Sequence, residues 1–156
     1  MTRSELTRDT RNMSLAELRD FLTDHLVNFV APFWPKHAID REHGGILVGI
    51  DLEGREPVYW RNAEKKLWWG VHAETLGGLL VAYEHCCEDW CLGWYHRVHE
   101  WSFAHFPVPE HGEWTQRLGR EGKKITTLIA LPVKDPFHLP RSLIVAIGTL
   151  RRLAGP

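Results

Sequence analysis

Two stretches of this chain align without a gap, EHGGILVGIDLEG at residues 42–54 and EHGEWTQRLGREG at residues 110–122. Both begin with Glu-His-Gly and end with Glu-Gly, and each follows an expected helix and a turn that contains proline. A helix, turn and hairpin used twice is typical of repeat folds, in which one unit cannot bury its apolar face alone and stacks against copies of itself. Chance similarity over so short a stretch is the alternative.

The apolar spacing predicts helices for most of the chain. Ser14 and Glu17 have the spacing of a capping box, at the start of a helix that runs to about Phe29. Further helices are expected over about 66–85 and 88–105, and a last one opens with Pro140. The stretch ILVGIDLEG and the segment 113–131 predict short hairpins. We therefore expect residues 1–13 to be a disordered tail and residues 14–156 to be a single all-α domain with short β-hairpins between its helices.

The charge and cysteine content argue against several kinds of partner. Nineteen Lys and Arg face twenty Asp and Glu, so no basic surface for nucleic acid or an anionic membrane is expected. The N-terminus has no apolar signal segment, and no uncharged apolar run is long enough to span a membrane. Three crowded cysteines, Cys86, Cys87 and Cys91, have neither an even number nor zinc-ligand spacing. We expect free thiols, no metal, no cofactor and a cytoplasmic protein.

The aromatic content favours a small polar ligand. Eight Trp and ten His accompany a net charge of -1. This composition is typical of carbohydrate sites, because flat rings cover the C–H faces of sugars while polar groups bind the hydroxyls. The alternative is that the Trp side chains fill the core.

The segment KLWWGVHAETLGGLL at 66–80 joins two Trp, a His and a Glu to a helical pattern. His72 and Glu74 are two positions apart, so on a regular helix their side chains diverge by about 200° and cannot face one ligand. Gly70 is a candidate source of irregularity at this helix start. The alternative is a solvated Glu74 beside a core Trp69.

His138 precedes the last expected helix, in the segment KDPFHLPRSL. The positive end of the helix dipole disfavours imidazolium, so a neutral ring that can act as a general base is expected. Pro136, Phe137 and Pro140 restrict the loop, and Arg141 adds a cation at the same helix start. The alternative is a histidine that only caps a turn.

Three blocks of this sequence, KLWW followed by His-x-Glu, then WSFAHFPVPEHGEW, then PFHLPR, resemble the C-terminal part of the N-acylglucosamine 2-epimerase family. The resemblance covers about residues 57–153, and residues 15–54 are similar to the family's N-terminal segment. It implies an (α/α)6 toroid in which histidines exchange the C2 proton of an open-chain sugar through an enediolate.

The resemblance also implies roles for particular residues. His138 resembles one of the two acid/base histidines, and Glu74 resembles the glutamate that binds sugar hydroxyls. Trp68 or Trp69 resembles the tryptophan that stacks on the sugar. We assign the neighbouring His72 and Arg141 to substrate binding as well. The expected site therefore consists of His138, Glu74, Trp68, Trp69, His72 and Arg141.

The chain departs from the family pattern in length and in two motifs. It is well under half the usual length, and the central histidine that serves as the other acid/base has no counterpart. Gly70 appears as an inserted residue, which would turn the Trp pair by about 100° relative to His72 and Glu74. We therefore interpret the chain as a truncated or internally deleted member that forms a partial toroid, with residues 14–54 and 57–153 joined.

This interpretation predicts a sugar 2-epimerase or aldose–ketose isomerase whose activity is weak or absent in the short chain, because one of two bases is missing. The alternatives are a non-catalytic carbohydrate-binding or interaction module and a gene remnant. Helix edges that the complete toroid would cover lead us to expect a homo-oligomer.

Overall fold

The structure is a computed structural model, and it describes residues 10–30, 33, 36–51, 53, 55, 66–125 and 137–155. Helices dominate these residues, as the sequence predicts. The longer ones are α1 (Leu15–His25), α3 (Glu74–Cys86), α4 (Asp89–His105) and α5 (His138–Ala154). Two π-helical turns, η3 (Leu26–Val30) and η5 (Trp68–Ala73), follow α1 and precede α3. The 3-10 turns are η2 (Thr10–Asn12) and η6 (Pro109–His111), and the strands are β1 (Lys66–Leu67), β2 (Pro107–Val108), β3 (Glu113–Trp114) and β4 (Arg117–Leu118).

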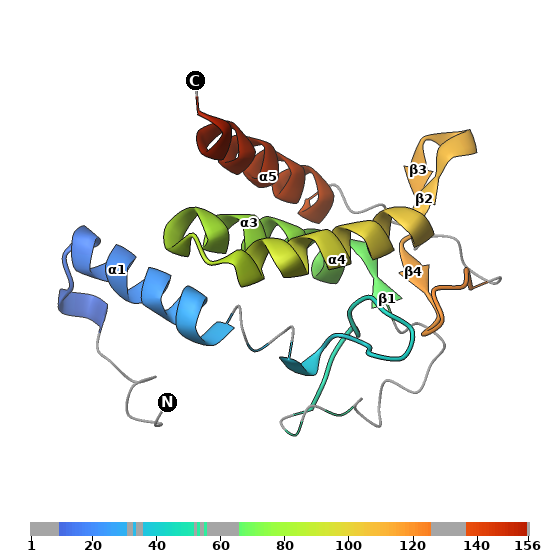
Figure 1. Cartoon of the computed structure of the whole chain (residues 1–156), viewed down its shortest axis with the longest axis horizontal. Coiled ribbons are helices and arrows are strands. Elements are labelled where there is room, and N and C mark those ends of the chain that lie inside the picture. Colours follow the sequence, from blue (N-terminus) through green and yellow to red (C-terminus); the bar gives the residue numbers. More distant parts are fainter. Residues whose placement is uncertain are drawn as a thin grey trace.

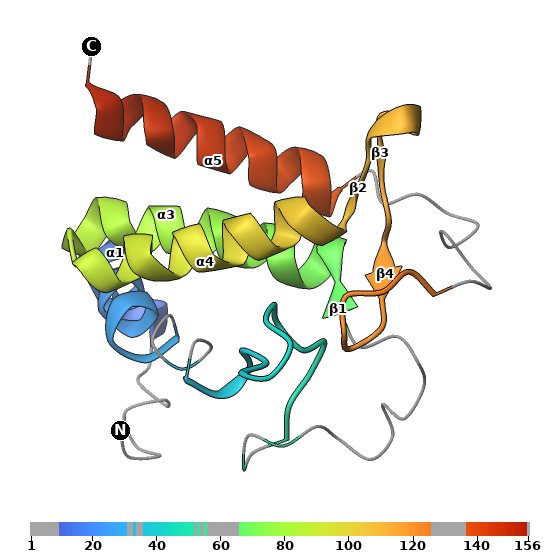
Figure 2. The same ribbon diagram turned by 45° about the vertical axis from the view of Figure 1, so that its right-hand side comes forward.

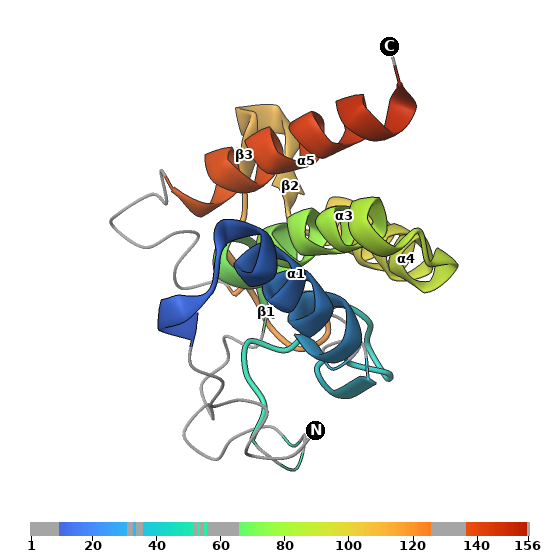
Figure 3. The same ribbon diagram turned by 90° about the vertical axis from the view of Figure 1, so that its left-hand side faces the viewer.

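The helices are arranged in layers around the α3–α4 hairpin (Figure 1). α5 lies along one side of this hairpin, while α1 and the segment 36–51 lie on the other side (Figure 2). Figure 3, turned by 90° from Figure 1, shows the same order, with α3 and α4 between α5 and α1. Among the described helices, none has both the length and the apolar character needed to cross a membrane.

Most helix boundaries agree with the sequence, and the exceptions have physical causes. The capping box of α1 is present, with the Glu17 N–H donating to Ser14 Oγ at 3.3 Å and the Ser14 N–H donating to Glu17 Oε2 at 2.8 Å. The last helix begins at His138 rather than Pro140, because a proline is tolerated anywhere in a first turn, where N–H groups lack helical partners. Residues 10–12, expected in a disordered tail, form the turn η2; residues 1–9 lie outside the described part.

The helix expected to begin at Lys66 begins later. Lys66 and Leu67 form β1, and the π-helical turn η5, which contains Gly70, precedes α3. A π turn holds one residue more than an α turn, so it accommodates an inserted residue without changing the helix that follows. Gly70, which we expect to be an inserted residue, lies in this wider turn.

The repeated sequence stretches form the same local structure. Ile39 pairs with Ile46 in the first, and at aligned positions Pro107 pairs with Trp114 in the second, both antiparallel. The aligned glycines Gly44 and Gly112 both have positive φ, 71° and 61°. Two backbone hydrogen bonds also match. The bond from Leu47 N–H to Ala38 O (2.9 Å) corresponds to the bond from Thr115 N–H to Phe106 O (2.7 Å). The bond from Asp51 N–H to Arg55 O (2.7 Å) corresponds to the bond from Gly119 N–H to Lys123 O (2.9 Å). This agreement favours a true repeat over chance similarity.

A second turn, expected around Arg120 and Gly122, is also present. Leu118 bridges Lys124 across it, and Gly122 has a φ of 77°. On its other edge β4 pairs antiparallel with β1, so this turn is tied to the start of the α3 segment. Residues 126–131, the far part of this predicted hairpin, lie outside the described residues.

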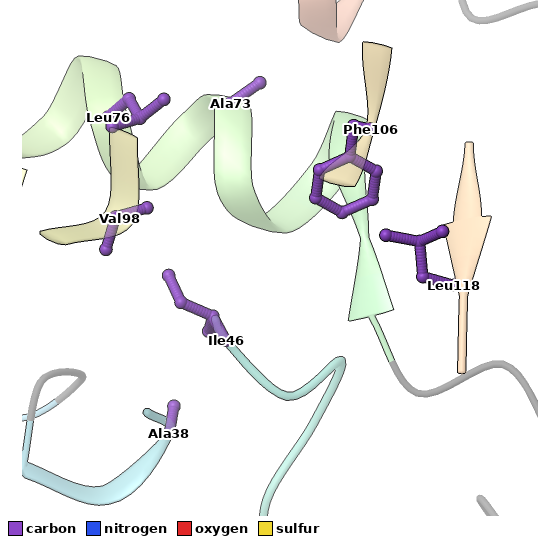
Figure 4. Close-up of a cluster of buried hydrophobic side chains, with 7 residues drawn as sticks. All are labelled: Ala38, Ile46, Ala73, Leu76, Val98, Phe106 and Leu118. Atoms are coloured by element: carbon purple, nitrogen blue, oxygen red, sulfur yellow. The ribbon is translucent and has the colours of Figure 1, made fainter. Parts of the chain in front are cut away.

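The main core joins the repeats to the helical hairpin (Figure 4). Ile46, Val98 and Phe106 are at most 2% exposed. Ile46 lies in the first repeated turn, Val98 lies within α4, and Phe106 directly follows α4. The cluster of buried side chains consists of Ala38, Ile46, Ala73, Leu76, Val98, Phe106 and Leu118. It lies at the end of the hairpin where α3 begins, and therefore supports the residues that start α3.

Candidate functional site

Three polar side chains meet where α3 and α5 begin. Glu74 is the first residue of α3, His138 is the first residue of α5, and Arg141 lies one turn further along α5. Both helices start on the same side of the molecule (Figure 2), so their first turns place these residues together.

One carboxylate oxygen is shared by two donors. His138 Nδ1 lies 2.9 Å from Glu74 Oε1, and Arg141 Nη2 contacts the same oxygen. The side chains of His138 and Glu74 are 34% and 29% exposed, so the cluster is open to solvent but partly enclosed. The prediction that His138 is more exposed than a core histidine and lies close to Glu74 is therefore confirmed.

The contact with Glu74 orients the His138 ring. An ionised carboxylate only accepts hydrogen bonds, so the proton of a neutral imidazole is placed on Nδ1 and the lone pair on Nε2. Phe137 packs edge-on against His138 and under the Arg141 guanidinium, with centre-to-centre distances of 5.2 Å and 5.0 Å. The arrangement can hold a base, a carboxylate and a cation around one polar solute.

His72 is not part of this cluster. Its ring is fully buried, and its Nε2 accepts a hydrogen bond from the Ile46 N–H at 2.9 Å. Trp101 stacks on the ring at 5.2 Å and Phe106 meets it edge-on at 4.9 Å. A fully buried ring has no surface for a ligand, so this expected substrate contact is not supported, and η5 does not bring His72 to the side of Glu74.

Trp68 and Trp69 lie in η5, immediately before His72. Their side chains are outside the described part of the structure, so the predicted stacking on a sugar remains a prediction. Within the described residues no three His, Cys, Asp or Glu side chains are placed to hold a metal ion.

A buried charged group that sequence reasoning missed lies below the first turn of the repeat. Lys66 and Asp40 are 0% and 3% exposed, with Lys66 Nζ 3.3 Å from Asp40 Oδ2. Arg120 Nε donates to the same oxygen at 2.9 Å. The only sequence signal was Asp40 ahead of a Gly-Gly turn, a position from which its side chain accepts the N–H groups of Glu42 and His43.

The surroundings shift the pKa values of both partners. Burial alone would raise the pKa of Asp40, but Arg120, the His43 N–H and Lys66 together hold it well below its usual range. Burial lowers the pKa of Lys66, and the attraction of Asp40 opposes that effect. Lys66 also donates to Gly44 O and lies over the Trp101 ring, 4.7 Å from its centre. This network fixes the turn that carries Ile46, and through Ile46 it contacts His72.

The three cysteines are free thiols, as predicted. The Sγ atoms of Cys86 and Cys91 lie 3.6 Å apart, across the turn between α3 and α4. Burial, with the neighbouring Cys86, raises the pKa of Cys91 to about 12. Cys91 therefore stays protonated and acts as a core residue.

Comparison with known proteins decides the family. The model of the family described as N-acylglucosamine 2-epimerase (GlcNAc 2-epimerase) matches residues 30–140. This chain belongs to the N-acylglucosamine 2-epimerase family.

Curated relatives of this family member include the N-acylglucosamine 2-epimerases of Bos taurus and Homo sapiens. They are 36% and 32% identical, over 73% and 79% of this chain. The matched regions make up 26% and 31% of those relatives, so the chain spans less than a third of their length. A crystal structure of D-mannose isomerase superimposes with a TM-score of 0.68 at 19% identity, covering 84% of this chain and 32% of that one. The expected helical, partial-toroid fold is confirmed.

Proposed function

We propose that this chain carries one half of the proton-transfer machinery of a sugar 2-epimerase or aldose–ketose isomerase. The supporting observation is the shared oxygen of Glu74, which holds His138 through Nδ1 and also binds Arg141. Family membership supports the substrate class, an open-chain sugar.

The chemistry follows from the orientation of His138. The hydrogen on C2 of an open-chain aldose is adjacent to the carbonyl, so a base that removes it leaves an enediolate. In our proposal His138 accepts this proton at Nε2, and the resulting imidazolium is stabilised by the Glu74 carboxylate. Arg141 has further N–H groups with which to bind the developing negative charge on oxygen.

A single base supports exchange of the C2 proton better than inversion of the configuration at C2. Epimerisation needs a proton returned on the opposite face, and the sequence provides no counterpart of the second histidine. His138 alone can remove a proton and return a solvent-derived one to the same face. We therefore propose slow exchange at C2 with little epimer formed.

The test is proton exchange in deuterated water. The chain is incubated with N-acetylmannosamine, mannose or glucose, and loss of the C2 proton signal is followed by NMR. We expect exchange above the uncatalysed rate, reduced about 10²-fold or more by His138→Asn. His85→Asn is the matched control, because His85 is exposed at the far end of α3. Exchange that is equal in the wild type, in His138→Asn and without protein would overturn the catalytic proposal.

Sugar binding without exchange would instead support the non-catalytic carbohydrate-binding alternative. It would appear as saturable chemical-shift changes near Glu74 that are lost in Glu74→Gln. The free thiols of Cys86, Cys87 and Cys91 fit a reducing compartment, and we propose the cytoplasm.

A further inference from the structure

A cavity lies away from Glu74 and His138, between the first turn of the repeat and α4. Its volume is about 510 Å³, within the range of small-molecule sites. The lining residues are Lys36, Ile39, Asp40, Arg41, Gly44, Trp94, Arg97 and Val98. The segment 36–51 and α5 lie on opposite sides of the α3–α4 hairpin (Figure 2), and no residue lines both sites.

The cavity carries an excess of positive charge. Lys36, Arg41 and Arg97 are exposed, and none of them forms an ion pair with another residue of the described chain. The one carboxylate in the wall, Asp40, is already bonded to Arg120 and Lys66 and does not neutralise them. Three exposed cations thus line one hollow, and none of them is held in an ion pair within the described chain.

The turn that forms one wall is held in place by hydrogen bonds. The turn that presents Arg41 is closed by the Gly44 N–H donating to Asp40 O at 2.8 Å. Trp101 Nε1 also donates to His43 O at 2.9 Å. A fixed turn presents its cation with little loss of backbone freedom on binding.

The remaining wall is aromatic. Arg97 lies over the Trp94 ring, 5.0 Å from its centre, which places guanidinium N–H groups beside a flat apolar surface. Guanidinium groups bind phosphate oxygens in pairs, and an indole face covers the apolar side of a ring. Cations next to an aromatic surface suit a ligand that has a phosphate group and a ring.

We propose that this cavity is a second binding site that takes a phosphorylated small molecule. The phosphate group contacts Lys36, Arg41 and Arg97, and the ring of the ligand packs against Trp94. This site is independent of the proposed exchange at C2, because it uses none of the residues of that reaction.

Calorimetric titration with glucose 6-phosphate, inorganic phosphate and glucose tests the site at low salt. Glucose 6-phosphate is expected to bind most tightly, phosphate more weakly, and glucose not measurably. Arg41→Ala and Arg97→Ala should each weaken glucose 6-phosphate binding about fivefold, the value of one exposed charge contact. Arg151→Ala is the matched control, an exposed cation at the far end of α5, and should leave binding unchanged.

Trp94→Leu separates the two parts of the site. It should weaken glucose 6-phosphate binding and leave phosphate binding unchanged. Added salt should weaken both ligands, because it screens exposed charges. The proposal is overturned if no ligand saturates the protein, if glucose binds as well as its phosphate, or if Arg41→Ala and Arg97→Ala, shown to be folded by circular dichroism, bind like the wild type.

Discussion

At the scale of single residues, we expect Glu74 to have a larger effect on C2 exchange than on stability. Its two contacts are partly exposed, so solvent screens them and each contributes on the order of 1 kcal/mol or less to folding. We expect Glu74→Gln and Arg141→Gln to lower the free energy of unfolding by less than about 1 kcal/mol. The same changes should reduce C2 exchange at least tenfold, since Glu74→Gln weakens the contact that orients the His138 ring and Arg141→Gln removes the cation that binds the developing negative charge. Urea unfolding and deuterium exchange on the same samples measure the two effects, and a large loss of stability would indicate a structural role.

His72, two positions away, should behave in the opposite way. His72→Leu keeps much of the side-chain volume but leaves the buried Ile46 N–H without its acceptor, which costs about 1–3 kcal/mol. His72→Gln can retain an acceptor and should be milder than His72→Leu. Urea unfolding of both variants measures the difference. Equal destabilisation would mean that the hydrogen bond contributes nothing.

These two residues also show how far the sequence could predict the site. The pairing of Glu74 with His138 spans 64 positions, and only the family resemblance placed them together. Helical geometry did predict that His72 and Glu74 diverge, and in the structure they do. Periodicity could not show which of the two faces the core, because that depends on the turn carrying Ile46, which packs there from elsewhere in the chain.

At the scale of elements, the repeated turns provide a matched pair of glycines. Both Gly44 and Gly112 have positive φ, so alanine is strained at either position by about 1–2 kcal/mol. A Cβ at Gly44 would also lie 2.5 Å from Trp101 Cδ1, whereas a Cβ at Gly112 would meet no atom within 4 Å. Gly44→Ala should therefore destabilise the protein by about 1–3 kcal/mol more than Gly112→Ala. Thermal unfolding of the two variants decides this, and similar midpoints would contradict the packing of Trp101.

The first repeated turn should also make the protein sensitive to acid. The pKa of Asp40 is below its ordinary value of 3.8 in the folded state, so its stabilisation is present above about pH 4 and is lost as the pH falls further. Asp40→Asn alone would leave the Lys66 charge buried and unpaired, a cost of about 3–5 kcal/mol. The double variant Asp40→Leu with Lys66→Met avoids that cost. Urea unfolding from pH 6 to pH 3 should show a smaller loss of stability for the double variant, and equal losses would assign the acid sensitivity to other groups.

Element boundaries were less predictable than element types. Apolar spacing located all four longer helices, because each has a face that recurs at helical intervals. It did not locate β1 or η5, since a two-residue strand has no periodicity and pairs with a distant partner, Arg117 to Leu118. For the same reason, the sequence did not predict that the Lys66 side chain is buried.

At the scale of the whole molecule, the uneven burial of the leucines and isoleucines bears on assembly. Leu76, Leu79 and Leu80 of α3 are at most 7% exposed and lie in the core. α5 packs on α3 through Ser142 and Thr149, which are buried, but it also carries an apolar stripe that the described chain leaves uncovered. Its members are Leu143, Ile144, Ile147 and Leu150, and each is at least 45% exposed.

This stripe leads us to predict self-association of the chain. At about 25 cal/mol per Å² of apolar surface, covering a few hundred Å² contributes several kcal/mol, which is comparable with the stability of a domain. We expect sedimentation to show a dimer or a larger species that dissociates in the variant Ile144→Glu with Ile147→Lys, which keeps the net charge unchanged. Leu15→Glu is the control, because Leu15 is 87% exposed on α1, far from α5. A monomer that unfolds in one sharp transition, and is no less soluble than the double variant, would show that the stripe is tolerated in water and that no second copy covers it.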